Sequence, residues 1–320
     1  MRWMCFFVLA GCVVAFAGEG WSDWEKRGDR LMDAGRFEDA KKAYKNALVC
    51  AEASHAGNDV IVLIRNSLVT AYAQRGEFAQ AEVESRRVLD LERRLHGPQS
   101  LEYAVVFASM GLLPMHSGNR DAEIDALRAA IERGDESGAQ IANAKDYLGK
   151  LLYNDRRFSE AEAVLEEAQA SYARSEKQTY WLGSELLNDL GVIREHQGRF
   201  SEAADLDTQA IDLIEAQFGA ECSSMITPLN NLATMYARMG RLEEAEKVYQ
   251  RAAELCVRLL GPEHPTYGAL LGNEAAVLRK LGRKKESKVL AAQSQRIEED
   301  SNRRNGVGAT VEVSALRAGN

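Results

Sequence analysis

The chain contains few prolines and few cysteines, five of each in 320 residues. Because proline removes a backbone hydrogen-bond donor and breaks helices, its scarcity leaves room for long uninterrupted helices. Ala, Leu, Glu and Arg, which lose little side-chain entropy in a helix, are abundant. A hydrophobic fraction of 46% is enough for a large core. We therefore expect an all-α fold.

Positive charge is also scarce. Lys and Arg number 40 against 48 Asp and Glu, which gives a formal net charge of −8, and no block of basic residues stands out. A protein that binds nucleic acid needs a dense Lys/Arg surface to neutralise phosphates. The composition therefore argues against nucleic acid as a partner.

Sequence signatures of catalysis and of metal binding are missing as well. The five histidines show no HExxH or other metal-ligand spacing, and no GxSxG or Walker loop occurs. After residue 17 only Cys50, Cys222 and Cys256 remain, without a CxxC spacing, which argues against a zinc site or a disulfide framework. We expect Cys50 and Cys256 to be small apolar residues on helices, whereas Cys222 falls in a connector, where a single bridge stays an alternative. We expect no enzyme, no cofactor and no metal.

The one long apolar run lies at the N-terminus. Arg2 is followed by apolar residues 3–17, which end in the small-x-small pattern of a cleavage site. The run is shorter than the ~20 residues that a membrane-spanning helix needs. Residues 1–17 are therefore predicted to be a signal peptide of an exported, periplasmic or secreted protein. A second interpretation starts from residues 9–12, Leu-Ala-Gly-Cys, which resemble a bacterial lipobox: 1–11 would then be a lipoprotein signal and Cys12 a lipid anchor, the only membrane attachment that we expect.

Beyond this segment a short pattern recurs along the chain. A glycine, which we call the anchor, is followed by an aromatic residue or Leu two positions later and by Ala five positions later, as in Gly35, Phe37 and Ala40. The pattern repeats completely or in part at anchors 35, 76, 118, 156, 198, 240 and 282, with Arg156 at the fourth. The intervals are 41, 42, 38, 42, 42 and 42 residues, so the chain is predicted to be an array of similar units.

The chemistry of each position indicates a helical hairpin. The anchor suits a turn with positive φ at the end of a first helix (the A helix), and the Ala lets the second (the B helix) approach closely. Eight positions before the anchor, large apolar residues occupy a core position in five repeats: Leu68, Met110, Leu148, Leu190 and Leu232. Seven positions before it, small residues mark the face where the two helices meet: Gly28, Val69, Gly111, Gly149, Gly191, Ala233 and Ala275.

These marks resemble the tetratricopeptide repeat, and the 42-residue period is similar to the kinesin light chain type. Residues 260–265 read Leu-Gly-Pro-Glu-His-Pro, which matches the connector of that type, and residues 230–233, Asn-Asn-Leu-Ala, match the opening of its A helix. The resemblance covers about residues 21–298. It implies a right-handed α-solenoid of about seven helix-turn-helix repeats, which we place at 18–300.

Three irregularities are expected in this array. Pro114 lies inside the third A helix, where it predicts a kink or a shortened helix. In the last repeat Glu274, Lys284 and Ser287 replace apolar residues, as in a capping repeat whose outer face meets water. Residues 301–320 lose helical periodicity and are predicted to form a mobile tail, with a short docked strand at 310–313 as the alternative.

A ligand is expected in the groove that the A helices line. Asparagines recur nine or ten positions before the anchor, and an Asn amide can pair with the backbone of an extended peptide. The resemblance implies this way of holding peptides; the alternative is that these side chains bond neighbouring helices. The candidate residues are Asn66, Asn188, Asn230, Asn231 and Asn273.

Basic residues near the ends of the A helices suggest a second feature of the groove. Lys150, Arg194 and Arg238 would favour a ligand with carboxylates, although cations in the last turn of a helix are also favoured by its dipole. We expect a non-catalytic scaffold that binds a peptide or partner protein. The alternatives are a structural or self-associating envelope component and a non-catalytic subunit of an enzyme complex.

Overall fold

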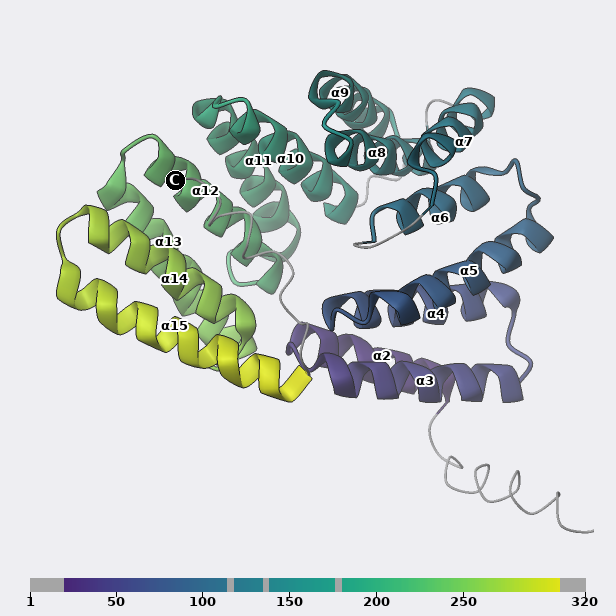
Figure 1. Cartoon of the computed structure of the whole chain (residues 1–320), viewed down its shortest axis with the longest axis horizontal. Helices are drawn as coiled ribbons and strands as arrows, with labels where there is room; N and C mark the ends of the chain where they lie inside the picture. Colours follow the sequence, from purple (N-terminus) through teal and green to yellow (C-terminus); the bar gives the residue numbers. More distant parts are fainter. Residues whose placement is uncertain (1–19, 114–117, 135–137, 176–179, 306–320) are drawn as a thin grey trace, which may run out of the picture. The chain divides into compact units, whose positions relative to one another are not determined.

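The computed structural model describes residues 20–113, 118–134, 138–175 and 180–305, which contain fourteen α-helices, one short 3-10 helix and no strand (Figure 1). Residues 1–19, which include the predicted signal and Cys12, lie outside this part of the chain, as do Pro114 and residues 306–320. The helices are α2 (Trp21–Asp33), α3 (Phe37–Ala53), α4 (Asn58–Gln74), α5 (Phe78–Leu95), α6 (Leu101–Gly111), α7 (Arg120–Arg133), α8 (Ala139–Asn154), α9 (Phe158–Arg174), α10 (Tyr180–His196), α11 (Phe200–Phe218), η1 (Ser223–Met225), α12 (Ile226–Arg238), α13 (Leu242–Leu260), α14 (Pro265–Lys280) and α15 (Lys284–Asn305).

The α-helices form seven consecutive A/B pairs, from α2/α3 to α14/α15. Helices pack within pairs such as α8/α9 and α12/α13, and a B helix then packs on the next A helix, as in α3 on α4, α9 on α10 and α13 on α14. A hairpin in such an array buries its apolar faces by stacking on its neighbours. The predicted all-α solenoid of about seven helical hairpins is confirmed.

The chain divides into two compact units: the first comprises the described residues up to Leu91, within α5, and those from Arg304 on, and the second runs from Glu92 to Arg303. The second unit contains α6 to α14 and most of α15. In it A helices also contact each other, α6 with α8, α8 with α10, and α12 with α14. The A helices of the second unit therefore share one side of the array. None of the helices in the described ranges has both the length and the apolar character that a membrane span requires.

The turn between the two helices of a repeat forms where the sequence places the anchor. Six of the seven anchors have positive φ values, between 60° and 80°. At Gly240 the turn is closed by two backbone bonds, because Arg241 N–H donates to the Tyr236 carbonyl at 2.9 Å and Gly240 N–H donates to the Ala237 carbonyl. All seven B helices begin two residues after their anchor. The anchor thus sets where every hairpin turns.

One of these six anchors, Arg156, carries a side chain, and its φ is 60°. A side chain in this left-handed conformation costs about 1 kcal/mol relative to glycine. We therefore expect Arg156→Gly to raise the free energy of unfolding by about 0.5–1 kcal/mol, measured by chemical denaturation. Gly198→Ala, the reverse change at an equivalent anchor with φ 76°, is expected to lower stability. A less stable Arg156→Gly variant would contradict this account of the turn.

The predicted core positions are buried. The five large residues eight positions before the anchor are at most 8% exposed. The alanines five positions after it, Ala40, Ala81, Ala161, Ala203 and Ala245, are at most 1% exposed. The small column is close-packed at two of its positions: a Cβ at Gly149 would lie 2.5 Å from the Cγ of Leu165 on α9, and one at Gly28 would overlap the ring of Tyr44 on α3. A and B helices therefore meet at the predicted face.

The last repeat differs from the expected capping repeat. Lys284 is exposed, but Glu274 and Ser287 are buried. The Ser287 hydroxyl donates to the carbonyl of Ala275 at 2.7 Å, and Gln250 donates to Glu274 at 3.2 Å. A buried polar group needs a hydrogen-bond partner, and both side chains find one inside the array. They therefore do not form the water-facing surface that we expected.

Helix boundaries correct one further expectation, the start of the tail, and confirm another, the shortened third A helix. Helix α15 continues to Asn305, five residues beyond the predicted boundary at residue 300, and Ser301 is buried on it. Helix α6 ends at Gly111, before Pro114, and with 11 residues it is shorter than α8 with 16. Cys50 and Cys256 lie on α3 and α13, as predicted, and Cys222 and Cys256 have free thiols; Cys256 is buried, and burial raises the pKa of its thiol to about 11.

A periodic set of ion pairs at the start of the B helices was not predicted. The residue after the anchor is Arg in five repeats, and its guanidinium pairs with an acidic residue three positions later, as Arg199 does with Glu202. Arg199 and Arg283 also reach the preceding repeat, at Glu162 and Glu246. Because these groups are partly exposed, each pair contributes little to stability. The remaining pairs of the set are Arg36–Asp39, Arg157–Glu160, Arg241–Glu244 and Arg283–Glu286.

Candidate functional site

Four of the candidate asparagines form one chain of side-chain hydrogen bonds across three A helices. Asn273 on α14 donates to Asn230 on α12 at 2.9 Å, and Asn231 on α12 donates to Asn188 on α10 at 2.8 Å. Asn230 donates to Asn231 at 3.3 Å, which joins the two steps. All four are half-buried. We call this set the Asn ladder.

The Asn ladder links neighbouring repeats and still has polar groups to offer. An Asn amide has two N–H donors and a carbonyl with two lone pairs. In these bonds Asn188, Asn230 and Asn231 each use one N–H and one acceptor position. Neighbouring A helices are therefore held together by groups that retain one donor and one acceptor position each.

At its α10 end the ladder runs into a cluster of charged groups. Asn188 donates to the neighbouring Asp189 at 3.4 Å. The Lys150 ammonium on α8 lies 3.2 Å from Asp189, 2.7 Å from Asp146 and 2.8 Å from Glu185. We call Asp146, Glu185 and Asp189 the acidic cluster. Lys150 and the Asn ladder thus belong to one polar network from α8 to α14.

The charges of this network shift each other's protonation. Burial would lower the pKa of the Lys150 ammonium, but Asp189, Asp146 and Glu185 raise it above its ordinary value, so Lys150 is charged. Burial raises the pKa of Asp189 well above its ordinary value; Lys150 lowers it, and Asp146 and Glu185 raise it further. A hydrogen bond with Asp146 raises this pKa as well, so Asp189 keeps its proton more readily than an ordinary carboxyl group, and Asp146 and Glu185 carry most of the negative charge beside Lys150.

The acidic cluster also has the spacing of a metal site, because one oxygen of each carboxylate lies within 4.8 Å of the others. The Lys150 ammonium lies within 3.2 Å of all three residues, and its Nζ is 5.7 Å from the centre of the Tyr147 ring. The cluster therefore already contains a cation. Its carboxylate oxygens can also accept hydrogen bonds from a second ammonium or guanidinium.

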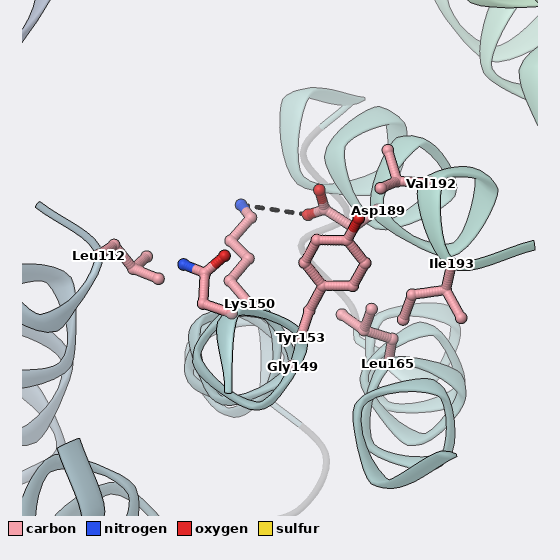
Figure 2. A pocket seen from close by; sticks show the side chains of 9 residues that line it. Leu112, Gly149, Lys150, Tyr153, Leu165, Asp189, Val192 and Ile193 are labelled. Carbon is pink, nitrogen blue, oxygen red and sulfur yellow. Dashed lines mark ion pairs between the residues drawn. The ribbon is translucent and has the colours of Figure 1, made fainter. Parts of the chain in front are cut away.

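A pocket of about 200 Å³ opens beside the ion pair of Lys150 and Asp189. Figure 2 shows Leu112 at one side of it, Tyr153 in the middle, and Val192 and Ile193 at the other side. Gly149, Asn154 and Leu165 complete the lining. The pocket therefore has mainly apolar walls and one charged rim.

The other candidate cations differ from what we expected. Arg194 pairs with Glu162 and, at 2.7 Å, with Glu166, both on α9. Arg238 lies 3.5 Å from Glu195. At Lys150 carboxylates outnumber the cation, so the local charge is negative and not positive as the basic-groove interpretation predicts. The cause is that carboxylates from an adjacent helix face each of these cations.

Asn66 does not join the ladder. It is exposed on α4 in the first unit, where its main-chain carbonyl accepts a hydrogen bond from the Thr70 hydroxyl at 3.2 Å. The structure therefore gathers Lys150, Asn188, Asn230, Asn231 and Asn273 into one network and places Asn66, Arg194 and Arg238 elsewhere. The acidic cluster was missed, although the four-residue spacing of Asp146 and Lys150 on one helix is visible in the sequence.

Comparison with known families gives three matches. Residues 62–102, 148–217 and 224–300 each match a model of the tetratricopeptide repeat, and together they take in more than half of the chain. The last two segments contain every residue of the polar network except Asp146.

Three individual proteins are similar to this chain. The protein named Protein KINESIN LIGHT CHAIN-RELATED 2, from Arabidopsis thaliana, is 25% identical over 198 residues, 60% of this chain and 30% of that protein. The chain thus spans less than a third of the length of this relative. The crystal structure of nearly identical TPR-like repeats of a Podosopora anserina kinesin light chain is similar with a TM-score of 0.55 and 18% identity, covering 65% of this chain and 100% of that one. The BtubC (BKLC) structure from P. vanneervenii has a TM-score of 0.49 and 20% identity, over 62% and 74% of the two chains.

Proposed function

Because the chain belongs to the tetratricopeptide repeat family, with repeats of the kinesin light chain-like type, we propose that it is a non-catalytic scaffold that holds a peptide or partner protein on the A helices of its second unit. Tetratricopeptide repeats are generally protein-interaction scaffolds. The observation that carries the proposal is the Asn ladder, whose half-buried amides retain donors and acceptors.

The chemistry of the ladder suits an extended peptide. A peptide backbone presents one N–H and one C=O per residue, and each needs a partner when it leaves water. The amides of Asn188, Asn230 and Asn231 carry both kinds of group on neighbouring repeats. They can therefore satisfy a backbone without reading its side chains, and selectivity must come from groups beside the ladder.

A capture experiment tests this proposal. The full chain is immobilised and compared with Asn188→Ala/Asn230→Ala/Asn231→Ala for the proteins it retains from an extract of its native cells. We expect the triple variant to bind the retained partner at least about tenfold more weakly, because three amides are worth more than 1.4 kcal/mol in binding.

The control variant is Glu243→Ala/Lys247→Ala/Arg251→Ala, three exposed residues on the B helix α13. It is expected to keep the partner and its affinity. If the ladder variant, with unchanged helicity, retains the same partner equally well, the ladder only joins repeats and the proposed binding face is wrong.

A further inference from the structure

The pocket beside Lys150 has the size of a subsite for one side chain. Its volume of about 200 Å³ is below the ~300 Å³ at which pockets for small-molecule ligands begin. Its walls come from the end of α6, from α8, from α9 and from α10, all within the second unit. It opens next to the α10 end of the Asn ladder, because Asp189 lines the pocket and accepts a bond from Asn188.

The charge beside the pocket is set by the acidic cluster. Three carboxyl groups surround a single ammonium, and Asp146 and Glu185 alone already outnumber it, so the cluster has an excess of negative charge (Figure 2 shows the pair of Lys150 and Asp189). Asp146 is only 2% exposed, and its Oδ1 has no hydrogen-bond partner. A buried carboxylate oxygen without a hydrogen-bond donor is unfavourable. The cluster therefore lacks a hydrogen-bond donor and a positive charge.

We infer that this pocket receives a Lys or Arg side chain of the bound peptide, which makes the scaffold selective for basic segments. The inference rests on the proposed peptide-binding function. The aliphatic part of the ligand side chain would lie against Leu112, Val192 and Ile193, while its cationic end reaches Asp189 and Glu185. Tyr153 adds an aromatic ring, to which a guanidinium or ammonium is attracted.

A ligand carboxylate fits this place poorly. It would find only Lys150 as a cation, and Lys150 is already paired with three carboxylates within 3.2 Å. Like charges brought together at an interface are unfavourable, which excludes partners of the wrong sign. The geometry therefore favours a basic partner and disfavours the acidic one that Lys150, taken alone, would suggest.

Peptide pools of known chemistry test the inference on the full chain. Each pool contains N-acetylated, C-amidated, fluorescently labelled octapeptides with Arg, Lys, Leu or Glu fixed at the fourth position and neutral residues elsewhere. Fluorescence anisotropy gives the apparent Kd. We expect the Arg and Lys pools to bind about tenfold more tightly than the Leu pool and more tightly still than the Glu pool.

Two charge-matched variants identify the site. The double variant Glu185→Gln/Asp189→Asn is expected to abolish the preference for the basic pools. The single variant Glu185→Gln is expected to reduce this preference without affecting the fold, because the Glu185 side chain is 51% exposed. Asp205→Asn/Glu215→Gln removes the same number of charges from exposed positions on α11 and is expected to keep the preference. Equal loss in this control would show general electrostatic attraction and overturn the inference.

The remaining outcomes separate the two proposals. If all pools bind equally, or if the Leu or Glu pool binds best, the pocket does not select a cation and the inference is wrong, while the scaffold function stands. If the wild-type chain binds no pool, the proposed peptide binding fails and the inference fails with it.

Discussion

Substitution of Lys150 by methionine is expected to lower the free energy of unfolding by about 3 kcal/mol. The Lys150 side chain is 26% exposed, and its ammonium is the one cation within 3.2 Å of Asp146, Glu185 and Asp189 in the described part of the chain. Methionine keeps most of the side-chain volume but leaves the carboxylates facing each other. The loss comes mainly from this repulsion and from the desolvation of Asp146, which is 2% exposed.

A double-mutant cycle with Asp189→Asn isolates the electrostatic part of this effect. Lys150 lies 3.2 Å from Asp189 and lowers its pKa, so the ammonium favours the ionised carboxylate, and Asp189→Asn removes this attraction only where Lys150 is present. In the Lys150→Met background the pKa of Asp189 rises further, so Asp189→Asn replaces a neutral group by a neutral group and is expected to change stability less than it does in the wild type; the expected coupling is about 1 kcal/mol. Denaturant midpoints followed by circular dichroism give the four stabilities.

The result that would contradict this account is additivity. If Lys150→Met costs the same with Asp or Asn at position 189, the ammonium acts through packing against Tyr147 and not through the acidic cluster. The inferred cation subsite would then lose its electrostatic basis, because it depends on negative charge that a single ammonium leaves uncompensated.

The sequence predicts the hairpins well because their determinants are local. A residue that tolerates positive φ ends the A helix, and Ala40 or Ala245 allows the B helix to lie against it; each is visible at a fixed offset. The network beyond the hairpins depends on the stagger between repeats. Asn231 bonds Asn188 and Asn273 bonds Asn230, both 43 residues apart, one more than the common period.

That single-residue stagger could not be read from the sequence, which shows equivalent positions but not how far adjacent A helices slide past each other. Lys150 was predicted as a groove cation, and the residue does line the pocket. Its partner Glu185 follows 35 residues later on another helix, a separation that no periodic pattern marks. The sign of the local charge around Lys150 was therefore the part of the site that only the structure could give.

Gly149 and Gly191 occupy the same position, seven residues before their anchors, yet their substitution by Ala is expected to change stability in opposite directions. A Cβ at Gly149 would lie 2.5 Å from the Cγ and 2.6 Å from the Cδ2 of Leu165, a core residue that is 1% exposed. At Gly191 the nearest atoms would be 3.9 and 4.0 Å away, which is ordinary contact.

The sizes of two opposing contributions, helix propensity and overpacking, decide whether each variant is more or less stable than the wild type. In a helix, Ala is favoured over Gly by about 0.5–1 kcal/mol, so Gly191→Ala is expected to raise the free energy of unfolding by that amount. At Gly149 this gain is outweighed by overpacking, which costs about 1–3 kcal/mol, because Leu165 cannot move without displacing its neighbours in the core. The expected net loss is about 1 kcal/mol, and Leu165→Ala should make the Gly149→Ala change favourable. If both glycine variants were stabilised, the A and B helices would not approach as closely at Gly149 as the small-residue column requires.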